Sequence, residues 1–513
     1  MDIPSKSERT ESTRFYQRGS LGEAEYCFPT TIAQQGFQYL DQLERGNPAW
    51  NIAVRFRLRG PLQIALVERA LSDIVARHEI LRTTFAVIDD LPMQIVHAGA
   101  VIPLPVEDLS RLTPAEREVA EERLTIEEGA RRFDLSVGPL LRALLLRFAA
   151  DDHMLLLTVH HIVSDGWSIG ILNDEIAAFY ESYLTHEKPR LPELPFQFAD
   201  FAIWQNEKMS DDTLEKHRVY WKERLARLPL CEIPPDYPRP PIKTHNGYIL
   251  STLLPVPLTE SLVKRAHALD GTFFNIAAAA LLVLIHHYAK QDDIVVGTLL
   301  AGRDRVDLEP LVGLFINTIV LRTDLAGDPT FSEVVNRMRK VFDEALIHQD
   351  LHFQQVVEAL KPKRDPSRPP LYSINFIYQR DFVKPLSFSG LTMQPYPSKS
   401  PGAIYDLNFF MVQRADGWRL SCEYNCDLYD ARTVNRLIGQ LHHIFEQVAS
   451  QPGMRVSSFS FPSDVGEPLP AFLPGANGRK SHADSANGAA RHSSGIGTVF
   501  SERGATPTKP NRL

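Results

Sequence analysis

The sequence predicts a mixed α and β fold, because helix-like and strand-like patterns alternate along a chain of ordinary globular composition. The chain has 513 residues, and at roughly 100–200 residues per domain such a length predicts several compact units. Hydrophobic residues make up 44% and charged residues 23%, which is enough apolar mass for a true core. The formal net charge of −8 argues against a nucleic-acid-binding protein and leaves small molecules or other proteins as partners.

The two ends of the chain differ from its middle in composition. Residues 1–25 are polar and charged and lack the apolar segment of a secretory signal. The tail 463–513 is rich in Gly, Ser, Ala, Pro and Asn, and cannot bury enough surface to fold alone. We therefore expect disordered ends and a folded part over residues 26–462.

In the first half of this folded part, the spacing of apolar residues predicts strands and helices in turn. Ile52–Arg59 alternates apolar and basic residues, as a half-buried strand does. A helix opening at Pro61 has its apolar residues on one face: Leu62, Leu66, Ala70, Ile74 and Val75. Two apolar runs, Leu140–Phe148 and Met154–Val159, predict a hairpin, and Ile169–Leu184 predicts a helix. The segment 192–198 then breaks the pattern, near an expected lobe boundary between residues 190 and 191.

The second half continues in the same way. We expect a helix at Ala266–Tyr288, a closing helix at Arg432–Ser450, and strands at Ile294–Thr298, Ile316–Leu321 and Ile374–Tyr378. The longest apolar run, Ile276–Ile285, is too short to span a bilayer. Four cysteines cannot form a disulfide framework, so we expect a reduced, cytoplasmic protein without membrane association.

Three adjacent histidine pairs are the first candidates for chemistry. His286–His287 ends an apolar helix, where imidazolium suits the negative helix end, and His442–His443 lies within a helix. Both pairs are interpreted as structural. His160–His161 differs, because it follows a predicted strand and leads into a turn, where α/β folds often place reactive groups. From the residues alone, a proton-transfer site and an ordinary capped loop fit this stretch equally well.

Two other motifs are decoys. Gly166–Gly170 matches the G-x-S-x-G elbow of serine hydrolases, but its Ser168 falls in the first helical turn, after the strand-to-helix turn is complete. Gly475–Ser481 lacks the Gly-Lys-Ser order of a phosphate loop and lies in the tail. Neither decoy predicts a function, and the sequence offers no convincing metal site.

His160–Gly166 resembles the HHxxxDG signature of nonribosomal peptide synthetase condensation domains, in the superfamily of chloramphenicol acetyltransferase-like acyltransferases. Two positions depart from the family pattern: Gly36–Phe37, where an Arg-Leu-Trp type sequence is usual, and His352, where proline is usual. Further motifs that resemble those of the family follow in family order over residues 27–460: Thr31–Gln35 with Asn51–Ile52, Arg77–Phe85, Phe198–Trp204, Val312–Arg322, His348–Phe353, Arg364–Leu371, Tyr405–Asn408 and Tyr424–Leu428.

The resemblance implies two acyltransferase-like lobes, residues 26–190 and 191–462, arranged as a V-shaped pseudo-dimer with the active site in a tunnel between them. It implies that His161 is catalytic. His160, Asp165 and Gly166 would support the site, with Asp165 paired to Arg82 in preference to Arg77. The expected contacts with substrate or tunnel are Trp167, Ser168, Asn317 and Arg322.

By the same resemblance, the reaction joins an acyl or aminoacyl thioester on a carrier protein to an amine or alcohol acceptor. The phosphopantetheine arms of donor and acceptor carriers bring the substrates, and the protein binds no cofactor or metal of its own. We expect a monomer, either free-standing or part of a larger synthetase. A coenzyme A-dependent acyltransferase and a non-catalytic recruitment module are the alternatives, although the intact HHxxxDG motif disfavours the second.

Overall fold

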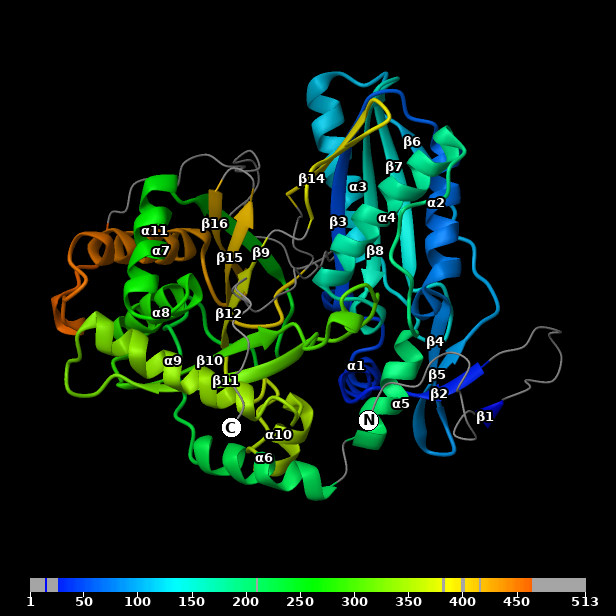
Figure 1. The fold of residues 1–513 in the computed structure, drawn as a ribbon. Helices are drawn as coiled ribbons and strands as arrows, with labels where there is room; N and C mark the ends of the chain where they lie inside the picture. Colours follow the sequence, from blue (N-terminus) through cyan, green and yellow to red (C-terminus); the bar gives the residue numbers. More distant parts are fainter. Residues whose placement is uncertain are drawn as a thin grey trace, which may run out of the picture.

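The structure is a computed structural model in which the chain forms two halves, each built on a six-stranded sheet (Figure 1). It describes residues 14–15, 26–208, 211–380, 383–397, 402–414 and 417–463. Apart from the short strand β1 (Arg14–Phe15), the N-terminus predicted to be disordered, 1–25, lies outside the described residues. The tail from residue 464 onward and the decoy Gly475–Ser481 lie outside them as well.

The sheet of the N-terminal half contains the histidine-bearing strand. Its order is β13–β14–β3–β8–β7–β6. The strand predicted at Ile52–Arg59 is confirmed as β3 (Asn51–Arg59), and the predicted hairpin as β7 (Leu141–Ala149) with β8 (Asp152–His160). The remaining strands are β6 (Val106–Asp108), β13 (Leu386–Phe388) and β14 (Leu391–Tyr396).

Helices cover both faces of this sheet. α2 (Ile64–Arg77) and α4 (Gly166–Thr185) bury the larger core on one face, and α3 (Pro114–Ala130) covers a smaller apolar cluster on the other. The helix predicted at Ile169–Leu184 starts earlier, at Gly166, because the Asp165 side chain accepts a hydrogen bond from the Ser168 N–H and caps it.

A smaller four-stranded sheet, β1–β2–β5–β4, completes the N-terminal half. α5 (Phe198–Lys208) packs against β2, so the chain just after the predicted lobe boundary contributes to the N-terminal half. α1 (Ile32–Leu43) contacts the turn that follows β8. The other three strands of this sheet are β2 (Tyr26–Pro29), β4 (Thr83–Ile88) and β5 (Leu91–Val96).

The C-terminal half is built on a second mixed sheet, of order β11–β10–β12–β15–β16–β9. The strands are β9 (Gly247–Leu253), β10 (Asp293–Leu300), β11 (Asn317–Asp324), β12 (Ile374–Gln379), β15 (Leu407–Arg414) and β16 (Gly417–Asn425). The helices are α6 (Asp211–Arg224), α7 (Val256–Ala268), α8 (Phe273–Ala289), α9 (Phe331–Ile347), α10 (Phe353–Leu360) and α11 (Ala431–Ser450). The three strands and the closing helix predicted here are therefore confirmed.

The helix predicted at Ala266–Tyr288 is wrong, because two helices occupy this stretch. α7 ends at Ala268, Asp270 has a positive φ of 52°, and Thr272 caps the start of α8. The two helices meet at 102°. No single helix in the described part of the chain is long and apolar enough to cross a membrane; only this bent pair passes by length and composition, and α8 is buried in the core.

Segments from the C-terminal half of the chain join the N-terminal half. β14, from the C-terminal half of the chain, pairs with β3, with Met393 opposite Leu58; Figure 1 shows β14 beside β3. The segment 308–315 also buries apolar side chains in the N-terminal core. The lobe limits 26–190 and 191–462 stay a prediction, but the cores themselves are shared across residue 190.

Gly297, in the C-terminal sheet, lets the ring of Tyr372 pack directly against the strand backbone. A Cβ there would lie 2.1 Å from ring atoms of Tyr372, whose hydroxyl donates to that of Tyr405 at 2.9 Å. Because the buried ring cannot move aside, we expect Gly297→Ala to lower the free energy of unfolding by about 1–3 kcal/mol. Urea denaturation measures the effect. Gly453→Ala is the control, since nothing lies within 4 Å of its Cβ position, and equal midpoints for the two variants would contradict this account.

Candidate active site

The His160–His161 pair lies where a sheet strand ends and a helix begins, as predicted. β8 ends at His160, the 3-10 turn η3 covers His161–Val163, and α4 starts at the buried Gly166. Both imidazoles are buried. The pair is therefore shielded from bulk water, which disfavours the charged form of each ring.

The first histidine, His160, stabilises the turn that follows β8. Its Nδ1 accepts a hydrogen bond from the Ile162 N–H at 3.1 Å. Burial, with the charges of His161 and Arg142 as smaller causes, lowers the His160 pKa to about 3. The ring is neutral at neutral pH and the lone pair of its Nδ1 is already used, so His160 is poorly suited to take a proton from a substrate.

The second histidine, His161, is held differently. Among the described residues, no polar atom forms a hydrogen bond with its buried Nδ1. Burial lowers the pKa of His161 below 6.5, while the charge of Asp165 and backbone groups of His161 and Ser164 act in the opposite direction. A neutral imidazole in such a place can accept a proton near neutral pH.

Asp165 fixes the chain that follows His161. Its Oδ1 accepts from the backbone N–H and the hydroxyl of Ser168 at 2.9 and 2.7 Å, and from Arg303 Nη2 at 3.1 Å. Its Oδ2 accepts from the Phe315 N–H at 3.2 Å. Both oxygens are thus engaged, and they join the start of α4 to a segment of the C-terminal half. This arrangement fits the structural role expected of Asp165.

The arginine paired with Asp165 is Arg303, so the predicted pairing with Arg82, or with Arg77 as the alternative, is wrong. Arg77 pairs with Glu175 at 2.8 Å. Arg82 donates hydrogen bonds to the backbone carbonyls of Val75, Ala76 and His97. Arg77 thus joins the end of α2 to α4, and Arg82 serves the connection between α2 and the small sheet, whereas Arg303 enters the site from the end of β10.

Arg303 is the functional-site residue that the sequence prediction missed. Its guanidinium is 1% exposed, lies 4.0 Å from the ring centroid of Phe315, and has a pKa lowered by burial to about 10. It therefore stays charged at neutral pH. Gly302 precedes it with φ +64°, and a Cβ there would lie 1.9 Å from the Phe315 carbonyl oxygen. A glycine followed by an arginine at a strand end was the only signal in the sequence.

Ser168 of the G-x-S-x-G decoy belongs to the same buried network. Its hydroxyl donates to Asp165 and also contacts the carbonyl oxygen and N–H of Gly313, each at 3.1 Å. None of its hydrogen bonds within the described chain involves a histidine. This geometry is that of a helix-start residue holding two segments together, and it lacks the base that a serine nucleophile needs.

The other predicted contacts bond to residues outside the histidine turn, which comprises His160–Val163. Trp167 donates from its indole to the Glu309 carbonyl at 2.8 Å, beside Arg303. Asn317, the first residue of β11, donates to the Gln349 carbonyl and accepts from the Phe353 N–H. Arg322 lies five strand residues further, or roughly 17 Å, and pairs with Asp293 at 2.7 Å. The structure does not bring Arg322 to the histidine turn.

The two histidine pairs interpreted as structural make local contacts. His286 pairs with Asp292 at 3.0 Å, and His443 with Glu446 at 3.2 Å. Within the described ranges, no group of three His, Cys, Asp or Glu side chains could hold a metal ion.

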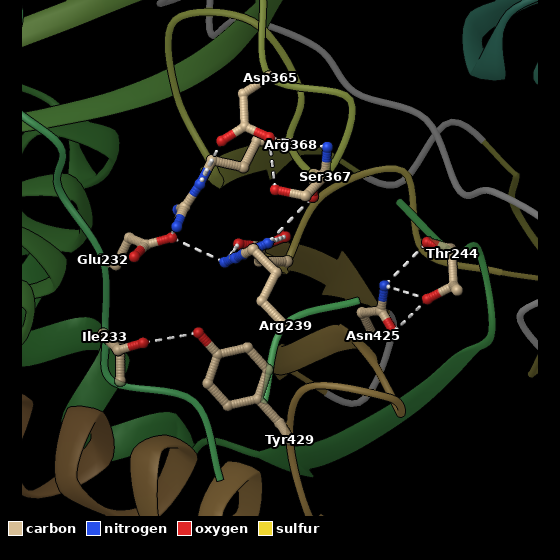
Figure 2. Close-up of polar contacts among 10 residues, drawn as sticks. Glu232, Ile233, Arg239, Thr244, Asp365, Ser367, Arg368, Asn425 and Tyr429 are labelled. Atoms are coloured by element: carbon tan, nitrogen blue, oxygen red, sulfur yellow. Dashed lines mark hydrogen bonds and ion pairs between the residues drawn. The ribbon is translucent and has the colours of Figure 1, made fainter. Parts of the chain in front are cut away.

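A second polar network secures the C-terminal half away from the histidines. Arg239 binds Asp406 and donates to Glu232 at 2.7 Å, while Arg368 pairs with Glu232 and with Asp365 (Figure 2). These contacts join the motifs Arg364–Leu371 and Tyr405–Asn408 to the loop before β9. Asn425 and Tyr429 hold the same loop at Thr244 and Ile233. These motifs therefore stabilise the C-terminal half.

Comparison with known proteins places this arrangement in a family. A family model described as a condensation domain matches residues 24–467. One of the linear gramicidin synthase subunits of Brevibacillus parabrevis is 37% identical over 433 residues, which cover 84% of this chain and 6% of that protein. The chain spans only 6–8% of the length of linear gramicidin synthase subunits B, C and D.

Solved structures share the two-lobed architecture. The complex of the X-domain and OxyB from teicoplanin biosynthesis matches with a TM-score of 0.74 at 29% identity, covering 88% of this chain and 98% of that one. The four-domain nonribosomal peptide synthetase holo-AB3403 matches with a TM-score of 0.78 at 23% identity, covering 87% of this chain and 35% of that one. The second match shows the fold alone, which is the predicted pseudo-dimer of acyltransferase-like lobes.

Proposed function

Because this chain belongs to the condensation-domain family, we propose that it catalyses the condensation step of nonribosomal peptide synthesis. It would join a carrier-bound acyl or aminoacyl thioester to an amine or alcohol. The observation that supports this proposal is the buried, neutral His161 at the exit of β8, next to a fixed Asp165–Arg303 pair. The site therefore offers a general base.

The proposed chemistry follows from these residues. The acceptor amine attacks the thioester carbonyl carbon, and a new C–N bond forms. His161 takes the surplus N–H proton, because its ring is neutral near pH 7. Collapse of the tetrahedral species breaks the C–S bond, and the proton passes to the departing thiolate. Asp165 does not act as the base, since its oxygens accept hydrogen bonds from Arg303, Ser168 and Phe315.

The partners belong to the same proposal. Carrier proteins would deliver the substrates on phosphopantetheine, and the chain itself would need no bound cofactor. We expect a monomer, and the small number of cysteines favours a reduced, cytoplasmic location.

A recruitment module is the second candidate, and one observation favours it. The X-domain, solved in a complex with OxyB, matches over 98% of its own length. A chain of this fold can therefore be found bound to another protein. Such a role would need no base at position 161.

An intact-mass assay separates these candidates. Purified protein is mixed with carrier proteins bearing a panel of acyl thioesters, with aminoacyl carriers and free amines or alcohols as acceptors, and the same acyl groups are offered as coenzyme A thioesters. Condensed product from carrier-bound donors, lost in His161→Ala and kept in Ser168→Ala, supports the proposal. Product from coenzyme A donors alone would identify an acyl-coenzyme A transferase. Carrier binding without product from any pair would favour recruitment.

A further inference from the structure

Helix α1 contacts the histidine turn through two side chains that lie three residues apart on one face. Gln34 donates from Nε2 to the Ile162 carbonyl at 3.2 Å. Phe37 stacks on His161, with ring centroids 5.3 Å apart and planes 20° from parallel. We propose that Phe37 is a positioning residue whose ring sets the plane of the His161 imidazole and keeps water from it. This inference rests on the proposed role of His161.

Stacking matters for His161 because its Nδ1 has no well-aligned hydrogen bond among the described residues, although backbone groups of His161 and Ser164 act on the ring. A histidine base is commonly aligned by an acceptor at its other ring nitrogen. In the described part of this chain, Nδ1 of His161 has no such acceptor. Packing therefore contributes to the orientation, and the stacked Phe37 ring lies within the 4.5–7 Å range of favourable ring contacts.

Phe37 is itself held firmly. Trp50 packs edge-on against it at 5.2 Å and 89°, and His160 lies edge-on at 6.3 Å. The titratable groups that act on His161 are Asp165, already paired with Arg303, and the neutral His160. None of them stacks on the ring. The plane of the His161 ring therefore depends on Phe37 more than on any charged neighbour.

The sequence marks this position as unusual. Gly36–Phe37 replaces the Arg-Leu-Trp type sequence of the family pattern. A Cβ at Gly36 would lie 2.3 Å from Gln354 Nε2, so the glycine lets a side chain of α10 lie directly against α1. Phe37, the second residue of this departure, places its aromatic ring on His161.

The test uses Phe37→Ala, Phe37→Leu and Phe37→Tyr in the full chain, with Phe133→Leu as the matched control. Phe133 packs edge-on against His160 at 6.0 Å and makes no ring contact with His161. Nitrogen-15 NMR of labelled histidines reports the pKa and tautomer of His161, and the His161→Gln spectrum assigns its signals. Condensation kinetics are measured on the same variants.

In Phe37→Ala the His161 pKa should rise toward 6.5, because water replaces the ring that shields it. The value of kcat should fall about tenfold with KM nearly unchanged, since the base is less well aligned. Phe37→Leu should give a His161 pKa and a kcat between those of the wild type and Phe37→Ala. Phe37→Tyr should keep both values close to those of the wild type. An unchanged His161 titration in folded Phe37→Ala or Phe37→Leu would overturn the proposal. The NMR titration tests the role of Phe37 even if no condensation is detected. Absence of condensation would count against the proposed function and not against the role of Phe37.

Discussion

Replacement of His161 by alanine is expected to slow condensation by roughly 10²–10⁴-fold, the usual contribution of a general base. The fold should survive the change, because the ring makes no side-chain hydrogen bond through its Nδ1 in the described structure. Single-turnover measurement of product by mass spectrometry gives the rate, and thermal unfolding confirms that the variant is folded. His286→Ala is the control, since that imidazole pairs with Asp292 at the end of α8, in the C-terminal half.

The pH dependence identifies the base. The His161 pKa is lowered from 6.5 by burial, so wild-type activity should be lost only at a pH below 6.5, as the pH falls through the His161 pKa and the ring becomes protonated. A separate rise near pH 8 comes from deprotonation of an acceptor α-amine, whose pKa is about 8. In His161→Ala the lower limb should be absent and the upper limb kept. A rate within a few-fold of wild type, with both limbs present, would exclude His161 as the base.

Local sequence patterns were sufficient for several elements of the fold. β3, the β7–β8 hairpin and α11 each carry an alternation or a periodic apolar face that survives in the structure. The helix at 266–288 was mispredicted because its apolar periodicity continues across the Asp270–Gly271 turn. The pairing of β14 with β3 could not be predicted, because a local sequence pattern does not specify which distant strand a strand pairs with.

The sequence predicted only the site residues that lie in one continuous segment of the chain. His161, Asp165 and Gly166 follow each other in the chain, so a motif captures them together. The partner of Asp165 lies 138 residues away, and in the sequence Arg77, Arg82 and Arg303 are chemically equivalent. Only the folded position of the segment after β10 shows that Arg303 is the partner of Asp165. Long-range ion pairs are the part of such a site that one sequence cannot specify.

Replacement of Arg303 by alanine is expected to lower the free energy of unfolding by about 3–5 kcal/mol, because it leaves Asp165 buried without its counter-charge. Asp165 is fully buried, and Arg303 is the only cation paired with it among the described residues. Denaturant unfolding measures the change. Arg305→Ala is the matched control two residues further on, where a partly exposed pair with Asp307 should contribute at most about 1 kcal/mol.

A double-mutant cycle tests the cause of this loss. If the cost of Arg303→Ala comes from the stranded carboxylate, it should shrink in an Asp165→Asn background, where a neutral amide occupies the site. Arg303→Lys should not restore full stability, because a lysine cannot reproduce the flat guanidinium against Phe315 together with its bonds to Ser168 and the Leu311 carbonyl. Strictly additive effects of the two replacements would show that the pair is uncoupled. The link between the histidine turn and the C-terminal half would then depend on Ser168 and Gly313 instead.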